Sequence, residues 1–365
     1  MEKAKLFCDG FTSKSYFNVV MLVAREIYDS LPVNNSMLNF YFVEDMRINA
    51  CAYIESPCQD YIQVNVGTLV DIFAYMKTAM ADRMVFREIG NPDRECDAII
   101  SGMFDPEIRQ LYFTGQPVDE ERDNMAFYLS LFTIRFVITH ELGHLYNGHL
   151  GLLKELYSIQ KSEMFIKAIV DRPRYALDRR TMEMDADAFA ATSAMLNILE
   201  IYKEINRGDV AEVATNNLPK GEVLFKLWAF AIHTLFLLFE HICKIQYLNS
   251  EWYLPNEARA ILAFGAAVNT LDECRKHGKF ICDEATYKRI RDNIHRGIVE
   301  AEKYYNRKFG ESYNFMQSAS ENSEFYRYAD EVLNYWNTTL ERKLRRYARI
   351  QLYNPDTIDA VVCRI

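Results

Sequence analysis

The stretch from Asp123 to Gly148 constrains the fold most, because it lacks proline and keeps apolar residues along one face. Such a stretch predicts a long helix that is largely buried. Within it, the letters HELGH place His140 and His144 four residues apart, with Glu141 between them. On a helix these two histidines lie about 40° apart around the axis, so both imidazoles can reach one metal ion. The alternative, an amphipathic helix whose histidines merely face solvent, fits the uncharged flanking residues less well.

Glu141 projects from a different part of the helix surface and cannot easily bind the same ion. It can instead hold a metal-bound water and accept its proton as a general base. A catalytic zinc also needs a third protein ligand and an open fourth position. His149 is the nearest candidate, but it follows His140 by nine residues, about half a helical turn from the ligand face. We therefore expect His149 to be a helix C-terminal cap beside Gly148.

A second acidic motif lies downstream, in the letters TMEMDADAFA at 181–190. Glu183 and Asp187 are again four residues apart, and the neighbouring alanines allow close approach to the first motif. Glu183 can complete a zinc shell, while Asp187 accepts the far ring proton of a ligating histidine and fixes its tautomer. Asp185 faces another side, where we expect it to be solvated or salt-bridged. The letters also suit an ordinary acidic helix start, but together with HELGH they predict one zinc ion per chain, bound by Glu183 and both histidines.

The remaining pattern predicts a mostly helical α+β fold with a small N-terminal sheet packed beside a helical body. Short segments rich in β-branched and aromatic residues come before the HELGH helix, and amphipathic helices follow it. We divide the chain into a catalytic region at 1–271, with an α/β part at 1–118 and active-site helices at 119–271, and a helical C-terminal extension at 272–365. The other predicted elements are strands at Leu38–Val43, Ile48–Ile54 and Tyr61–Val66, and helices at Ser13–Ser30, Gly67–Met80, Thr181–Tyr202, Glu222–Ile245, Glu257–Leu271, Glu284–Lys308 and Glu324–Ile350.

The formal net charge of −9 argues against a general nucleic-acid binder, because a phosphate backbone would be repelled overall. The eight cysteines form no CxxC pair and no signal peptide is evident, so we expect reduced thiols in a cytoplasmic protein. The apolar run from Val223 to Phe239 is interrupted by Lys226 and is shorter than the roughly 20 residues of a membrane span. We expect it to be a buried core helix. The basic run from Lys343 to Arg349 suits the solvated face of a helix.

HExxH followed by a helix that reads ExxxD resembles the gluzincin class of zinc metallopeptidases. The segments THELGHLYNGH, EMDADAFA, INACAY and YIQVNVGTLVDIF are most similar to Lit-type phage-exclusion peptidases, with HtpX-like and ImmA/IrrE-type peptidases as relatives. The resemblance implies a zincin-like fold, a Glu183 ligand supported by Asp187, hydrolysis of peptide bonds in an intracellular protein, and a role in antiviral defence against phage. The histidine that the family carries before a proline is Leu254 here, which leaves Tyr253 or Arg259 to stabilise the developing oxyanion.

Gluzincins bind an extended peptide along an edge strand near the zinc, through backbone hydrogen bonds. The candidate edge strand here is Asn49, Ala50, Cys51, Ala52 and Tyr53, although the same residues could simply pack the sheet. The expected partners are a protein or peptide substrate and a regulatory protein, whereas nucleic acid and a membrane are not expected. Two alternatives stay open: an ImmA/IrrE-like regulatory protease, for which no helix-turn-helix segment is evident, and a non-enzymatic helical interaction protein with a structural zinc.

Overall fold

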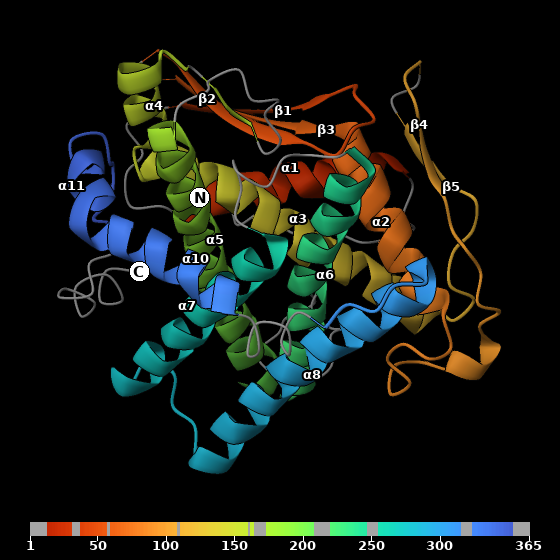
Figure 1. Ribbon diagram of the computed structural model, residues 1–365. Helices are drawn as coiled ribbons and strands as arrows, with labels where there is room; N and C mark the ends of the chain where they lie inside the picture. The colour runs from red at the N-terminus through yellow and green to blue at the C-terminus, as the bar shows by residue number, and fades with distance from the viewer. Residues whose placement is uncertain are drawn as a thin grey trace.

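A computed structural model describes nine ranges of the chain, residues 13–30, 37–56, 59–107, 110–159, 161–163, 173–207, 220–246, 255–314 and 323–352. In this part of the chain the structure is predominantly helical, with a small sheet built mainly by the N-terminal region (Figure 1). The predicted α+β class is therefore confirmed at this level.

The main sheet has four strands in the order β1-β3-β2-β6. β1 (Met37–Val43) runs parallel to β3 (Gln59–Asn65), and β2 (Ala50–Ser56) runs antiparallel to both of its neighbours. The short β6 (Lys161–Glu163) comes much later in the chain and pairs with the middle of β2. The edges of the sheet are therefore β1 and β6, and β2 is an interior strand.

The long helix that carries HELGH is α3 (Glu120–Tyr146), and it lies against the sheet and against α2 (Val66–Ala81). It begins after Asp119, whose carboxylate accepts a hydrogen bond of 3.3 Å from the backbone N–H of Arg122. The Arg122 guanidinium is fully buried, and Glu95 lies 3.7 Å from it. It holds the loop after α2 against α3 by donating to the backbone carbonyls of Met80, Asp82, Val85, Phe86 and Ile89.

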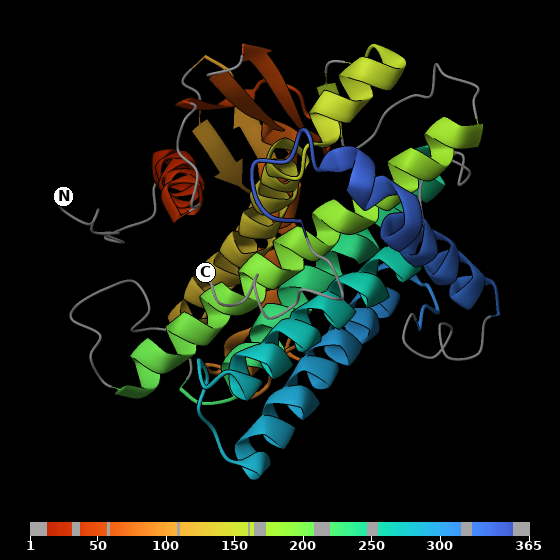
Figure 2. The ribbon, with the colours of Figure 1, turned by 90° about the vertical axis from the view of Figure 1, so that its left-hand side faces the viewer.

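Four further long helices complete the body: α5 (Pro173–Arg207), α6 (Val223–Gln246), α7 (Asn256–Lys276) and α8 (Glu284–Phe309). α5 packs against α3 and α7, and α6 packs against α3 and α8. Figure 2 shows these helices stacked side by side, with the sheet and α1 (Ser13–Ser30) at one end. The predicted boundary after residue 271 stays a prediction, and across it α8 shares one apolar core with α6.

Two helices, α3 and the segment Val223–Ile242 of α6, are long and apolar enough to cross a membrane. Most of each is buried inside the protein, as in the core helices of soluble proteins. This burial agrees with the core helix expected at Val223–Phe239. Four of the eight cysteines, Cys51, Cys96, Cys274 and Cys282, are free thiols.

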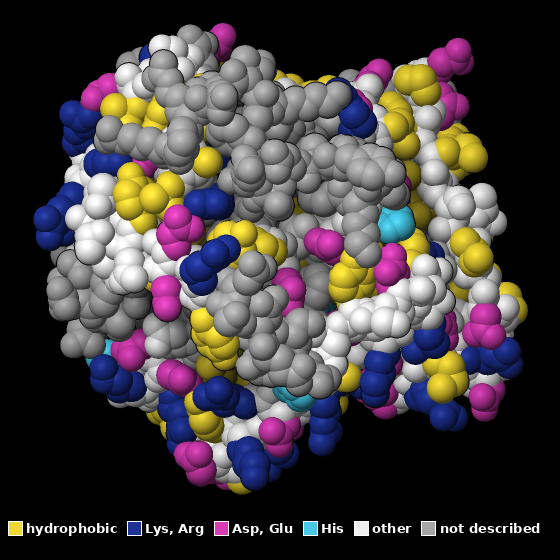
Figure 3. Space-filling view, viewed as in Figure 1, with side chains coloured by type: hydrophobic (Ala, Val, Ile, Leu, Met, Phe, Trp, Pro, Cys, Tyr) yellow, Lys and Arg dark blue, Asp and Glu magenta, His cyan; other side chains and the backbone are white. Residues whose placement is uncertain are grey.

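A separate hairpin, which the pattern did not predict, joins β4 (Gly102–Asp105) to β5 (Gln110–Phe113). Met103 and Tyr112 are paired across its two strands, and their side chains are 56% and 41% exposed. Hydrophobic side chains line this side of the molecule in Figure 3, while positive and negative side chains are interspersed over the rest of the same face. The hairpin lies at the opposite side of Figure 1 from α4 (His149–Tyr157).

The single C-terminal helix predicted at Glu324–Ile350 is wrong, because the structure divides this stretch. α10 (Ser323–Tyr335) is followed by a π-helical turn, η2 (Trp336–Leu340), and by the short α11 (Glu341–Leu344). The π-helical turn changes the phase of the helix and buries Trp336.

Tyr347, Ala348 and Arg349 follow α11 and form a segment that we call the C-terminal strap. The backbone N–H of Arg349 donates to the carbonyl of Tyr146, the last residue of α3, over 2.7 Å. Its guanidinium pairs with the buried carboxylate of Asp60 in β3 over 2.7 Å. The basic run is therefore not simply a solvated face, because its last arginine joins the C-terminal region to the sheet and to α3.

Candidate metal centre

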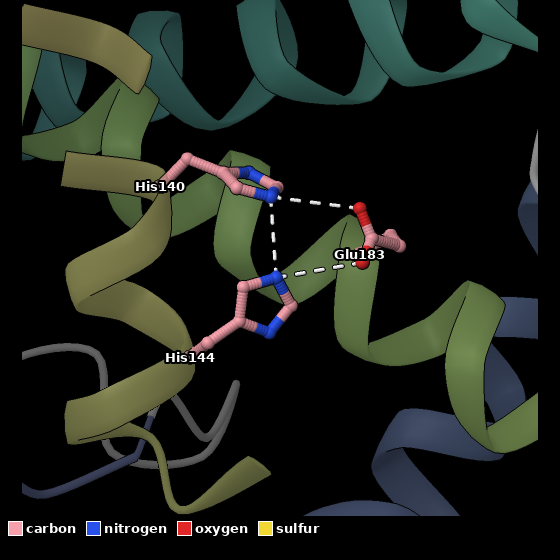
Figure 4. Close-up of side chains that lie close together, drawn as sticks. All are labelled: His140, His144 and Glu183. Carbon is pink, nitrogen blue, oxygen red and sulfur yellow. Dashed lines mark hydrogen bonds and ion pairs between the residues drawn. The ribbon is translucent and has the colours of Figure 1, made fainter. Parts of the chain in front are cut away.

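Three side chains from two helices converge on one point. His140 and His144 project from α3, and Glu183 projects towards them from α5 (Figure 4). The Nε2 atoms of the two histidines are 3.2 Å apart, and the carboxylate oxygens of Glu183 lie 3.5 Å from His140 Nε2 and 3.4 Å from His144 Nε2. Each side chain belongs to a residue that is at most 1% exposed, so the group is shielded from water.

A metal ion fits this group by distance and by chemistry. Ligands placed tetrahedrally around zinc at about 2.0–2.1 Å lie about 3.3 Å from one another, close to the three separations in this group. The ligand atoms all lie within 4.8 Å of one another, and no fourth His, Cys, Asp or Glu of the described ranges joins them. The buried His-His-Glu group can therefore bind a metal ion, and its three ligands leave one tetrahedral position for water or substrate.

Asp187 and Arg259 hold the ring of His140. Asp187 Oδ1 lies 2.8 Å from His140 Nδ1, the contact expected from the spacing of the acidic motif. Arg259 of α7 donates to the same carboxylate through Nε at 2.7 Å and Nη2 at 3.0 Å. Burial disfavours a charged imidazole, but the hydrogen bond and charge of Asp187, together with Glu183, raise the pKa of His140 to about 10 before any cation competes for the ring.

The other two ligands are held in the forms that bind a cation. Burial alone would raise the pKa of Glu183, but Arg179, whose Nη2 lies 2.7 Å away, and hydrogen bonds to the two histidines hold that pKa well below its usual range. Burial lowers the pKa of His144 well below its usual value, so this ring stays neutral. A carboxylate and a neutral imidazole are the protonation states that coordinate metal ions.

Glu141 differs from Glu183, which pairs with Arg179, because Glu141 has no ion pair in the described part of the chain. It is 0% exposed, and neither carboxyl oxygen has a hydrogen-bond partner there. Burial raises the pKa of this carboxyl to about 8, against the opposing effect of the charge on His140. A buried carboxyl without a hydrogen bond or an ion pair destabilises the fold, and buried groups with shifted pKa values are typical of functional sites.

His149 lies close to the metal centre, and the predicted C-terminal cap is wrong. α3 ends at Tyr146, and Gly148 then adopts a left-handed conformation with φ of +85°. This turn starts α4 in a new direction and brings His149 Nδ1 to 2.9 Å from His144 Nδ1. The half-turn offset calculated from the spacing would hold only in an unbroken helix, and Gly148 was the sequence signal that the helix ends.

The predicted substrate-binding edge strand is not an edge, so this prediction is wrong. Asn49 precedes β2, and Cys51, Ala52 and Tyr53 form backbone pairs with β6 on the side that a peptide would need. Ala50, Cys51 and Ala52 are buried, which fits the alternative that these residues pack the sheet. The pairing of β2 with β6 joins segments about a hundred residues apart, so it leaves no local pattern.

Tyr253 and Arg259 are the two residues predicted to stabilise the oxyanion. Tyr253 lies outside the described residues. Arg259 is 2% exposed, pairs with Asp187 through both Nε and Nη2, and has Nη2 3.5 Å from Glu183. In this structure Arg259 supports the ligands, and its action on an oxyanion stays a prediction. Sequence reasoning missed Arg179, which contacts Glu183 from one helical turn earlier.

No protein-family model, no curated protein and no solved structure matches this chain. The structure defines a class of site, a buried His-His-Glu group that can hold a metal ion beside a buried carboxyl. Any assignment of activity therefore depends on the chemistry of these residues and on their motifs.

Proposed function

We propose that this chain is a zinc-dependent endopeptidase of the gluzincin class with a zincin-like catalytic region. The observation that carries the proposal is the buried His140, His144 and Glu183 group beside Glu141, whose carboxyl oxygens have no hydrogen-bond partner in the described ranges. Two imidazoles and one carboxylate are a ligand set that zinc peptidases use. The likeness of the HExxH and ExxxD motifs to those of gluzincins supports the peptide bond as the substrate.

In the proposed reaction each residue has a distinct task. A zinc ion held by His140, His144 and Glu183 would supply Lewis-acid chemistry, polarising the scissile carbonyl and lowering the pKa of water. Glu141 accepts the proton of the attacking water and later returns it to the leaving amine. Asp187 keeps the His140 ring oriented, and Arg259 holds Asp187 in place.

A purely structural metal site is supported less well. Structural zinc sites are closed by four protein ligands, whereas three are found here within the described ranges. A structural site also gives no role to Glu141, an unsatisfied buried carboxyl that destabilises the fold. A regulatory protease of the ImmA/IrrE type would use the same chemistry and differ only in its substrate.

The proposal includes a cytoplasmic setting, a narrow intracellular protein substrate and a role in phage defence. Its support is the likeness of the motifs to those of Lit-type peptidases. The burial of the centre agrees with an activity that is held in check. His140, Glu141 and Glu183 are each at most 1% exposed, so a peptide can reach them only after a rearrangement.

Replacing Glu141 by glutamine tests the proposal, because glutamine has nearly the same volume but cannot accept a proton. We expect Glu141→Gln to fold and to bind zinc, with turnover lower by about 10²–10⁴-fold, the usual contribution of general-base catalysis. Glu302→Gln is a matched control at another buried carboxyl. Glu302 is 5% exposed and pairs with His233 at 3.1 Å, on helices α8 and α6.

The substrate is unknown, so the assay is cellular. New protein N-termini are mapped by mass spectrometry in cells that express the wild type, Glu141→Gln or Glu302→Gln, with and without phage challenge. Fragments made by the wild type and by Glu302→Gln, but not by Glu141→Gln, support a peptidase. If zinc-loaded Glu141→Gln reproduces every fragment and growth phenotype of the wild type, the metal is structural and the non-enzymatic interpretation replaces ours.

A further inference from the structure

His149 lies between a metal ligand and a carboxylate. It is 0% exposed, with Nδ1 2.9 Å from His144 Nδ1 and Nε2 3.0 Å from Asp185 Oδ2. Asp185 is 7% exposed and also accepts a hydrogen bond of 2.5 Å from Asn147 Nδ2. The side chains of Asp185, His149 and His144 therefore form a continuous line of buried hydrogen bonds from α5 to α3.

The direction of each hydrogen bond follows from the ligand geometry. His144 Nε2 faces Glu183, and to bind a cation it must offer a lone pair, so the ring proton lies on Nδ1. That N–H can only donate, so His149 Nδ1 must be the acceptor. A neutral imidazole that accepts at Nδ1 carries its proton on Nε2, and this N–H donates to Asp185. Every donor in the line meets an acceptor, so the tautomer of one ring fixes that of the other.

The backbone places His149 for this role. Gly148, immediately before it, has φ of +85°, and a Cβ there would lie 2.7 Å from the backbone of Ala348 in the C-terminal strap. The turn between α3 and α4 is thus held closely by a separate segment of the chain.

We propose that His149 and Asp185 are positioning residues for His144, which orient its ring and keep its Nε2 lone pair directed at the metal. The inference rests on the proposed metal centre and adds two residues to it. Both ligating histidines are then supported by carboxylates of α5, His140 directly by Asp187 and His144 indirectly by Asp185 through His149. Such support of a ligating imidazole raises its metal affinity.

Zinc affinity of the purified full chain tests this role, with Zn²⁺ alone as the probe and a chromophoric chelator as competitor. His149→Ala removes the acceptor, His149→Phe also fills the ring volume, and His149→Asn restores an acceptor near the Nδ1 position. We expect the first two to weaken zinc binding about 10–100-fold and His149→Asn to recover part of the loss. His233→Ala is the matched control, since His233 is also a fully buried histidine paired with a carboxylate, that of Glu302. It should leave the zinc affinity of the folded protein unchanged.

The tautomers of the zinc-loaded wild type give a readout that a merely structural role would not produce. Long-range ¹H–¹⁵N spectra of protein labelled at histidine report which ring nitrogen carries the proton. We expect Nδ1–H on His144, Nε2–H on His149 and an unprotonated Nδ1 on His149. Replacing Asp185 by alanine removes the acceptor of the His149 Nε2–H, so it should weaken the preference for this tautomer without abolishing it, because His144 Nδ1–H still donates to His149 Nδ1.

The outcomes separate this inference from the proposed function. A wild-type affinity in His149→Phe, or a proton on His149 Nδ1 in the zinc-loaded wild type, overturns the relay and leaves the metal centre intact. The spectra of the wild type decide the question even where the His149 variants fail to fold. Failure of the wild type to bind zinc, or undiminished binding by His144→Ala, instead overturns the metal centre itself.

Discussion

Zinc binding should release about two protons from this protein at pH 7. The centre contains a set of buried ionisable side chains besides the histidines, namely Glu141, Glu183, Asp185, Asp187, Arg179 and Arg259. Four carboxyl groups set against two guanidinium groups leave two negative charges in excess when all are ionised. Buried charge must be compensated, and before a cation binds, protons compensate it.

The two protons can be assigned from the pKa values. Although burial opposes its charge, Asp187 and Glu183 raise the pKa of His140 to about 10, so this ring is fully protonated at pH 7. Burial raises the pKa of Glu141 to about 8, so this carboxyl is mostly protonated at pH 7. A divalent cation that binds at His140 Nε2 displaces the first proton and supplies the charge that allows Glu141 to ionise. Binding then releases about one proton from His140 and nearly one from Glu141.

Calorimetric titration with Zn²⁺ in buffers of different ionisation enthalpy at one pH measures this number directly. Because protons leave on binding, zinc affinity should rise with pH between pH 6 and 7, by about 100-fold per unit for two protons. Glu141→Gln lacks the second proton, so it should release about one and show about a tenfold rise per unit. Equal proton release by the wild type and Glu141→Gln, or none by either, would refute the charge balance.

Three further outcomes are expected. In a chelator competition, Glu183→Ala should lose nearly all zinc, whereas Asp187→Asn should lose about 10–100-fold in zinc affinity. A larger loss of zinc affinity in Asp187→Asn than in Glu183→Ala would exclude Glu183 as the ligand. Both Gly148 and Gly310 have positive φ, but only at 148 would a new Cβ lie within 4 Å of other atoms. Gly310→Ala should therefore lower the free energy of unfolding in urea by about 1–2 kcal/mol, and Gly148→Ala should lower it by more. Arg122→Met should lower the unfolding free energy by about 3–5 kcal/mol, because it removes the cation beside the buried Glu95 and leaves five backbone carbonyls without the donor that Arg122 supplies. An unchanged melting temperature would contradict this.

Elements whose burial pattern is local could be predicted from the sequence. The helix at Ser13–Ser30 was predicted and observed with the same bounds, and HELGH lies in α3 as expected. Spacing placed His140 and His144 on one helix face and Glu183 with Asp187 on another, because residues four apart share a helix face. The combination of the two motifs then predicted the His140, His144 and Glu183 group that the structure brings together. Local periodicity was sufficient for these features because it determines which side of a helix is buried.

Features that depend on distant segments could not be predicted in this way. Whether β2 is an edge depends on β6, which lies about a hundred residues later and is only three residues long. Arg259 reaches Asp187 across 72 positions of the chain, and neither its spacing nor its neighbours indicate that contact. The C-terminal helix failed for a related reason, because the π-helical turn that buries Trp336 is set by what packs against it.

The C-terminal strap gives the last part of the chain a physical connection to the metal centre. Its backbone lies so close to Gly148 that a Cβ there would come within 2.7 Å of Ala348 N. Arg349 fixes the other side of the strap to the end of α3 and to Asp60 in the sheet. The turn that directs His149 is therefore held between the strap and α3. Because His149 contacts His144 by one hydrogen bond, a displacement of the strap would be transmitted to a ligand of the metal, which links the C-terminal extension to the geometry of the site.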